Sequence, residues 1–216
     1  MIKAPVIIVG AGGHGRVLAD ALLLAGRTVL GFVEADARLH DTTVMGLKVR
    51  GDDSRLIAGD WPEVVLVNGV GGQPGGRVRR DVQTRLEAEG RRFIGVRHPA
   101  AVVSPFAEID DTAQLLARAV VQAGAVVGHG CIVNTGAIVE HDCRLEPFTH
   151  CAPGSILCGD VRIGATCHIG AGAVVREGVT LGDGVVVGAG AVVVDDHAGP
   201  ALLLGVPARR GDGRGS

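Results

Sequence analysis

Residues 120–139 read VVQAGAVVGHGCIVNTGAIV, and this stretch decides the fold. Within it a branched residue recurs at every sixth position, from Val121 to Val139, and a small residue follows four positions after each one. A period of six fits neither an α-helix nor a heptad. It predicts a solenoid of short strands, in which each hexad buries one branched side chain and places a small one at a corner.

The same period continues on both sides of this stretch. From Val103 to Val193, Ile, Leu or Val occupies every sixth position except at Cys151. Residues 103–192 therefore form fifteen hexads without an insertion. Three hexads make one triangular coil of 18 residues, which predicts about five coils. Residues 18 apart are then expected to lie one above the other, about 4.8 Å apart, as in paired strands.

The first part of the chain has a different pattern, in which apolar runs alternate with helical ones. We expect strands at residues 5–10, 28–34, 63–68 and 92–99, and helices from about Arg16 to residue 26 and over residues 77–90. Such alternation is typical of a parallel sheet with covered faces. The prediction is a Rossmann-like half, an α/β domain at 1–98, followed by a β-helix domain with a C-terminal tail at 99–216.

Composition narrows the classes of function. A formal charge of −2, one Trp, four Phe and no Tyr provide neither a basic surface nor a stacking platform for nucleic acid. No apolar run reaches the roughly 18 residues of a spanning helix, and the N-terminus shows no secretion signal. We expect a cytoplasmic protein without membrane insertion. The five cysteines lack a CxxC spacing and are expected to be small buried hydrophobes.

The glycine loop GAGGHG, residues 10–15, follows the first expected strand and opens the first helix. Backbone N–H groups at a helix N-terminus can hold a pyrophosphate. The string also matches the G-x-G-x-x-G pattern of NAD-binding proteins, with Glu34 about 20 residues further on. However, only one mononucleotide-binding half is present, and no residues for hydride transfer follow, so NAD binding is not favoured and a merely structural turn stays open.

One hexad carries unusual chemistry. Val139 is expected to point inward, so Glu140, His141 and Asp142 face outward together. A carboxylate beside an imidazole fixes its tautomer and stabilises the cation that forms when it takes a proton. The group suits a general base, and the alternative is a set of solvated surface residues.

Taken together, GAGGHG at 10–15, IVEHDC at 138–143 and GVPARR at 205–210 resemble the hexapeptide-repeat acetyltransferases with a left-handed β-helix. Within them the chain is similar to the sugar-nucleotide N-acetyltransferase and sialic acid O-acetyltransferase branch. The resemblance implies direct acetyl transfer from acetyl-CoA to the amine of a UDP- or GDP-linked amino sugar, without a metal.

It also implies roles for individual residues. His141 would be the base and Asp142 would raise its basicity. A relative has Glu in place of Asp142, so a shared role for Glu140 stays open. The nucleotide sugar would contact Gly12, Gly13, His14, Glu34, Ala35 and Gly71. Acetyl-CoA would contact His150, Ala171 and Ala189. His168 matches no residue of the family; it lies 18 residues beyond His150 and is expected to be a surface residue above it.

The count of faces places Ala171 and Ala189 on a different side of the prism from His141, which predicts a homotrimer with shared sites. Three other functions stay open: a sialic acid-type O-acetyltransferase, a non-catalytic sugar-nucleotide-binding scaffold, and a γ-carbonic-anhydrase-like zinc lyase. The last would use histidines among His129, His141, His150 and His168.

Overall fold

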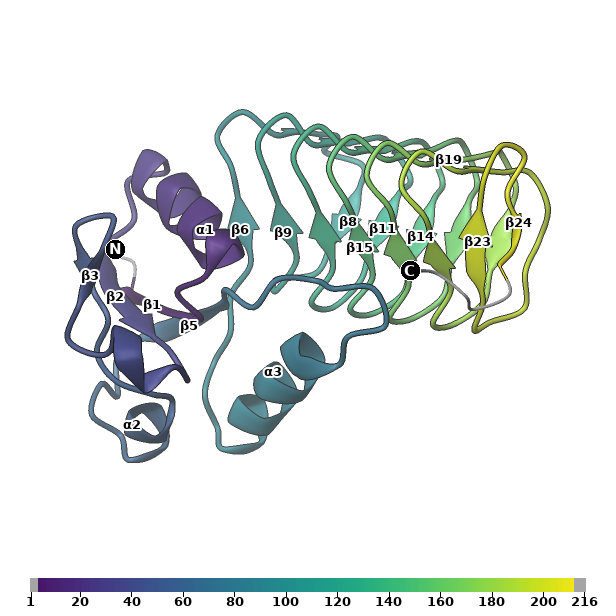
Figure 1. Ribbon diagram of the computed structural model, residues 1–216. Coiled ribbons are helices and arrows are strands. Elements are labelled where there is room, and N and C mark those ends of the chain that lie inside the picture. Colours follow the sequence, from purple (N-terminus) through teal and green to yellow (C-terminus); the bar gives the residue numbers. More distant parts are fainter. Residues whose placement is uncertain (1–3, 212–216) are drawn as a thin grey trace. The chain divides into compact units, whose positions relative to one another are not determined.

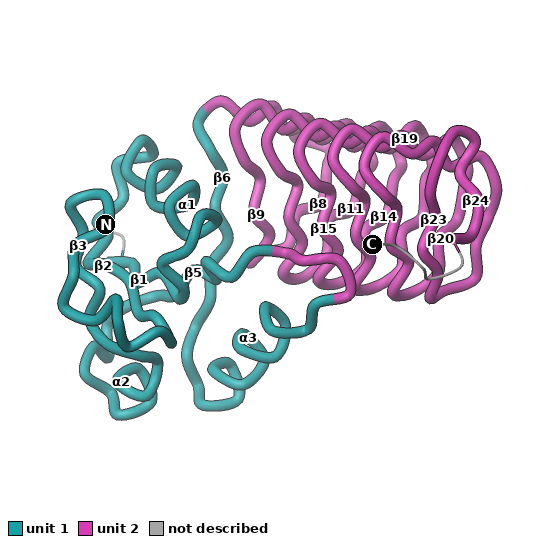
Figure 2. The backbone as a smooth tube through the Cα atoms, viewed as in Figure 1, with its two compact units in different colours: residues 1–71, 76–99 teal, residues 72–75, 100–216 magenta. Residues whose placement is uncertain are grey.

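The computed structural model describes residues 4–211 of the 216-residue chain. The chain divides into two compact units, shown in different colours in Figure 2. Of the first unit, residues 4–71 and 76–99 are described, and of the second, residues 72–75 and 100–211. The short segment 72–75 thus groups with the solenoid, although it lies in sequence inside the α/β part.

A three-stranded parallel sheet forms the centre of the first unit, in the order β2-β1-β5. Its strands are β1 (Val6–Val9), β2 (Val29–Val33) and β5 (Val65–Asn68). Every residue of β1 and β5 is buried, as expected for parallel strands covered on both faces. The predicted helices are present as α1 (Gly13–Leu24) and α3 (Val78–Ala88), and the last predicted strand is shortened to β6 (Val96–Arg97).

Several short elements of this unit carry no periodicity and were not predicted. They are the 3₁₀ helix η1 (Ala37–Leu39), the hairpin strands β3 (Thr43–Val44) and β4 (Leu47–Lys48), and the helix α2 (Ser54–Ile57). Met45 and Gly46 both have positive φ, of 52° and 75°, which suits the tight turn between β3 and β4. These elements are too short for a repeating pattern to reveal them.

The second unit is a β-solenoid whose short parallel strands stack on three faces, as columns such as β8, β11 and β14 show in Figure 1. The first face consists of β7 (Val102–Val103), β10 (Val120–Val121), β13 (Ile138–Val139), β16 (Ile156–Leu157), β19 (Val174–Val175) and β22 (Val192–Val193). The second consists of β8 (Glu108–Ile109), β11 (Val126–Val127), β14 (Arg144–Leu145), β17 (Arg162–Ile163) and β20 (Thr180–Leu181). The third includes β9 (Gln114–Leu115), β12 (Ile132–Val133), β15 (His150–Cys151), β18 (His168–Ile169), β21 (Val186–Val187) and β23 (Leu202–Leu204).

The register confirms the 18-residue coil. Val121 pairs with Val139, and Val139 pairs with Leu157. Five complete turns run from β7 to β21, and β22 and β23 begin a sixth. The chain then adds β24 (Arg209–Arg210), which pairs antiparallel with β23.

The interior of the solenoid consists of the predicted positions. Each branched residue of the hexad series from Leu115 to Val193 is buried, as is Cys151, and Val103 and Ile109 of the first turn are half-buried. Each such side chain contributes about 1.5–3 kcal/mol when fully buried. The corner residues from Ala113 to Ala191, which are small or β-branched, are buried too.

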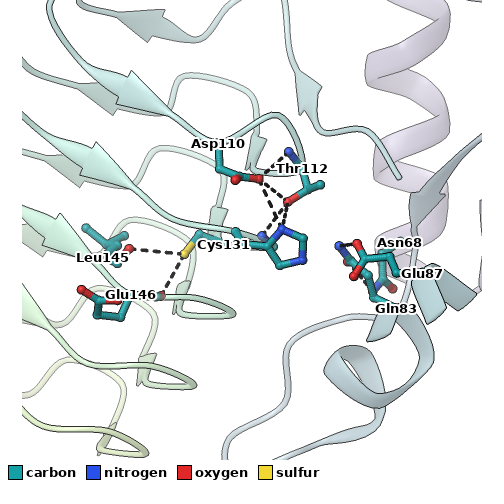
Figure 3. A network of polar contacts seen from close by, with 10 residues as sticks. Asn68, Gln83, Glu87, Asp110, Thr112, Cys131, Leu145 and Glu146 are labelled. Carbon is teal, nitrogen blue, oxygen red and sulfur yellow. Dashed lines mark hydrogen bonds and ion pairs between the residues drawn. The ribbon is translucent and has the colours of Figure 1, made fainter. Parts of the chain in front are cut away.

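A repeated contact satisfies four of the buried polar groups at the corners, whereas the Ser155 hydroxyl has no partner among the described residues. The Cys131 thiol donates to the Glu146 carbonyl, 15 residues further along, at 3.1 Å (Figure 3). Equivalent bonds, each again spanning 15 residues, join Cys143 to Cys158, Thr149 to Gly164, and Cys167 to Gly182. Burial raises the pKa of Cys143 and Cys167 to about 11. All five cysteines are free thiols, four of them buried and Cys158 half-buried, which confirms the expectation that they pack as small side chains.

Within residues 4–211, no helix has the length and apolar character needed to span a bilayer.

Candidate active site

His141 and Asp142 lie in the turn between β13 and β14. The His141 Nδ1 atom is 2.9 Å from Asp142 Oδ2. An ionised carboxylate only accepts hydrogen bonds, so Nδ1 carries the proton and Nε2 holds the lone pair. No residue in the described part of the chain hydrogen-bonds Nε2, and the two side chains are 57% and 65% exposed. The ring is thus more than half exposed, and its Nε2 lone pair is not engaged by the described residues.

The backbone of this turn suits an aspartate. Asp142 has φ of 62°, in the left-handed region, where aspartate is better tolerated than most residues. Gly124 and Gly178 take the same place one coil before and two coils after, with φ of 75° and 73°. The Asp142 N–H donates to the Ala123 carbonyl of the previous coil. The side chain is therefore held beside the histidine by the turn itself.

Several acids act on the same imidazole. The hydrogen bond to Asp142 raises the pKa of His141 above its ordinary value; partial desolvation opposes this effect, and the charges of Asp142, Glu140 and Glu177 add to it. Glu177 was not singled out in the sequence. It lies 36 residues, or two coils, beyond His141, and that spacing is the signal that identifies it.

His150 lies on β15 directly beneath His168 of β18, as the 18-residue spacing predicts. Their ring centroids are 4.9 Å apart in an edge-to-face arrangement. The expectation of a surface position for His168 is wrong: the residue is half-buried, its Nδ1 is fully buried without a described partner, and desolvation lowers its pKa. The ring packs against His150 on the third face instead.

The tautomer of His150 follows from its neighbours. The Thr135 N–H donates to Asn134 Oδ1 at 2.8 Å, which directs the Asn134 amide nitrogen to His150 Nε2 at 3.0 Å. Nε2 is then an acceptor, and Nδ1–H donates to the Gly72 carbonyl at 3.0 Å. His150 is only 8% exposed. Asn134 is a second residue that the sequence pattern did not single out.

The two alanines expected to contact acetyl-CoA lie at another corner of the solenoid. Ala171 and Ala189 are exposed and sit in successive turns after β18 and β21, where the Gly190 N–H donates to the Ala171 carbonyl at 2.9 Å. The predicted stacking of these alanines is confirmed. This corner joins the third face to the first, whereas His141 lies where the first face meets the second, so one chain holds the two groups on different edges of the prism.

In the glycine loop of residues 10–15, the individual glycines serve different structural purposes. A side chain at Gly15 would overlap the Gly10 carbonyl oxygen, so Gly15 permits close packing of α1 on the loop. Around Gly12 and Gly13, by contrast, an added Cβ would meet nothing within 4 Å. Gly12 is the N-cap of α1, and both residues are exposed. They leave open space at the helix N-terminus, as a bound anion requires.

The remaining predicted contacts of the first unit come together at the carboxyl ends of its strands. A Cβ at Gly71 would lie 3.5 Å from His14 Cβ, so these two residues are adjacent. Ala35 is exposed just after β2. The Glu34 carboxylate accepts the Ala11 N–H at 2.7 Å and so also holds the loop in place. This edge is where ligands bind in open α/β sheets.

Among residues 4–211, no group of three or more His, Cys, Asp or Glu side chains is arranged to hold a metal ion. His129 instead contacts Thr112 Oγ1 at 3.0 Å and lies 3.5 Å from Asp110, whose bond to Thr112 is drawn in Figure 3.

An α/β unit with a glycine loop, followed by a hexad solenoid with an exposed His–Asp pair, defines a hexapeptide-repeat transferase. Comparisons with known proteins agree. The family described as PglD N-terminal domain matches residues 5–86, and the bacterial transferase hexapeptide family (six repeats) matches residues 160–195. A comparison with curated protein sequences gives no match.

Solved structures match nearly the whole chain. The acetyltransferase domain of PglB from Neisseria gonorrhoeae, in complex with acetyl coenzyme A, is 39% identical, with 96% of this chain and 99% of that chain covered and a TM-score of 0.88. PerB from Caulobacter crescentus, in complex with CoA and GDP-perosamine, is 36% identical, with 96% and 97% covered and a TM-score of 0.89. A further structure from that organism is a perosamine N-acetyltransferase with one histidine replaced by asparagine, 36% identical over 96% of each chain, with a TM-score of 0.88. The chain belongs to the hexapeptide-repeat acetyltransferases that carry a PglD N-terminal domain.

Proposed function

We propose that the protein is an acetyl-CoA-dependent N-acetyltransferase that acts on the amine of a nucleotide-linked amino sugar. The observation that carries this proposal is the similarity, over 96% of the chain, to an acetyltransferase with acetyl coenzyme A and to a perosamine N-acetyltransferase with CoA and GDP-perosamine. The exposed His141–Asp142 pair supplies the base that such a reaction needs.

The amine nitrogen attacks the thioester carbonyl carbon directly. A C–N bond forms, the C–S bond breaks, and His141 Nε2 takes the proton that the amine loses. Asp142 keeps the proton on Nδ1 and stabilises the imidazolium. The proton then passes to the departing CoA thiolate, so neither an acyl-enzyme nor a metal takes part. Glu140 and Glu177 add negative charge that favours the protonated ring.

The nucleotide part of the acceptor is assigned to the first unit. The open space at Gly12 and Gly13 and the N-terminus of α1 suit a diphosphate. His14 follows in α1, Gly71 lies next to it in the loop after β5, and Ala35 follows β2. Glu34 would act mainly by holding the loop through Ala11.

Acetyl-CoA is assigned to the corner of Ala171 and Ala189, where small exposed side chains let a chain such as pantetheine approach the backbone. His150, whose two ring nitrogens both bond to protein atoms, would act there by packing. Because this corner and His141 lie on different edges of the prism, a closed ring of three chains would complete each site. We therefore propose a homotrimer.

A substrate panel tests the function. UDP- and GDP-linked amino sugars are each incubated with acetyl-CoA, free thiol release is followed, and the product is checked by mass for one added acetyl group. The matched control is the same sugar with a hydroxyl in place of the amine. We expect turnover with at least one amine and none with its hydroxyl analogue. Turnover confined to hydroxyl acceptors of the sialic acid type would contradict the proposal.

A further inference from the structure

The turns on either side of the His141–Asp142 turn carry glycine where they face the pair. Gly124 lies 18 residues before Asp142, and Gly159 lies 18 residues after His141. The three turns follow β10, β13 and β16, which pair in register on the first face. Each side chain of the pair therefore meets a neighbouring coil at a glycine.

Gly159 faces the imidazole. A Cβ at this position would lie 2.5 Å from both Cε1 and Nε2 of His141, and 3.2 Å from Nδ1. Carbon atoms of real side chains do not approach a ring so closely. The φ of Gly159 is not in the left-handed region, so the backbone itself would accept alanine. The constraint on this residue is the space that the ring occupies.

Gly124 faces the carboxylate. A Cβ at this position would overlap Asp142 Oδ1, the oxygen that does not bond to His141. Gly124 also has φ of 75°, so glycine is favoured there for its backbone as well. Gly136, in the turn after β12, separates the two effects: its φ is 65°, and an added Cβ would meet nothing within 4 Å.

We propose that Gly124 and Gly159 are positioning residues for the acetyl transfer, because their missing side chains leave the space in which His141 and Asp142 hold their paired orientation. The inference rests on the proposed function. Neither glycine gives or takes a proton in the proposed acetyl transfer. A methyl group at residue 159 would displace the ring and its Nε2, and a methyl group at residue 124 would displace the carboxylate from Nδ1.

Three alanine variants test this role. Gly159→Ala and Gly124→Ala should each lower kcat roughly 10- to 100-fold, the effect of misplacing a catalytic group by about 1 Å, with little change in either KM. Gly136→Ala has the same left-handed backbone as Gly124→Ala but touches no side chain, so it should keep nearly full kcat. A Gly136→Ala loss as large as that of Gly124→Ala would overturn the proposal, as would full activity of Gly159→Ala.

A double-mutant cycle tests whether Gly124 acts through Asp142. Asp142→Gly removes the carboxylate at a backbone position that suits glycine. In that background Gly124→Ala should have no further effect on kcat, since the atom it would displace is gone. An undiminished further loss would show that Gly124 acts on something else.

An NMR titration of the His141 ring without substrates separates this inference from the proposed function. Its contact with Asp142 raises the pKa of His141, so Gly124→Ala should lower that pKa, while Gly136→Ala should leave it unchanged. If the wild type acetylates no amino sugar but these titrations differ as expected, the proposed function fails and the positioning of the pair stands. The same His141 pKa in the wild type, Gly124→Ala and Gly136→Ala would overturn the positioning role.

Discussion

Replacing His141 with alanine tests the proposed base most directly. The side chain is exposed and lies in a surface turn, so its removal should leave the fold and both ligand sites intact. A positioned base contributes roughly 10²- to 10⁴-fold to the rate, and the single ring orientation set by Asp142 at 2.9 Å places this histidine within that range. We expect kcat of His141→Ala to fall by that factor, with both KM values close to those of the wild type.

Asp142→Asn should lower kcat less than His141→Ala does. The substitution removes the charge that favours the imidazolium but leaves the imidazole in the turn. Because both side chains are more than half exposed, solvent screens the lost charge. A reduction of about tenfold in kcat is therefore expected, since an amide can still accept from Nδ1 but no longer enforces that tautomer.

The pH dependence of the rate should show the ionisation of His141. His141 must be neutral to accept a proton, so the wild-type rate should fall as pH drops through its pKa, which Asp142 raises. In Asp142→Asn this limb should move to lower pH, and in His141→Ala it should vanish. The ionisation of the acceptor amine would remain in every variant and gives an internal reference.

Steady-state kinetics of thiol release, measured from pH 5 to 9 on variants of checked oligomeric state, would decide the matter. Near-normal kcat in His141→Ala, together with loss of activity in Glu140→Ala or His150→Ala, would refute the reasoning. The acids around His141 would then be surface charges only.

Three further predictions concern assembly, acceptor binding and stability. Light scattering should give about three times the 22.0 kDa chain mass, whereas a fully active monomer would exclude shared sites. Gly13→Leu should raise the acceptor KM and leave that of acetyl-CoA unchanged, because its side chain would fill the open space assigned to the nucleotide. The control is Gly15→Ala, whose Cβ would overlap the Gly10 carbonyl and should lower thermal stability instead. Equal effects of Gly13→Leu on both KM values would contradict the assigned role. Leu157→Ala should reduce the free energy of unfolding by about 2–5 kcal/mol in denaturant titrations, since this side chain is fully buried on β16. The control is Ile156→Ala at the half-buried neighbouring residue. An equal loss of stability in Ile156→Ala would argue against the packed interior.

The sequence by itself determined the solenoid, because its restraints are local and repeated. Each hexad specifies one buried branched residue and one small corner residue, and the spacing of 18 then fixes which side chains stack, as for His150 beneath His168. The strands and helices of the first unit were also readable, since β1 and β5 are continuous apolar runs. The unpredicted β3–β4 hairpin shows the limit: two-residue strands have no period of their own.

The tertiary structure alone decided how the functional groups meet. The resemblance assigns Glu34 to the nucleotide sugar, whereas folding brings its carboxylate to the Ala11 N–H. His150 bonds to Gly72, 78 residues away in sequence, a contact that no local pattern encodes. Likewise, all glycines look alike in a sequence, and only the atoms around them distinguish Gly159, which clears the His141 ring, from Gly13, which faces open space. A sequence lists the groups that are available, whereas the contacts among them depend on the packing of distant segments.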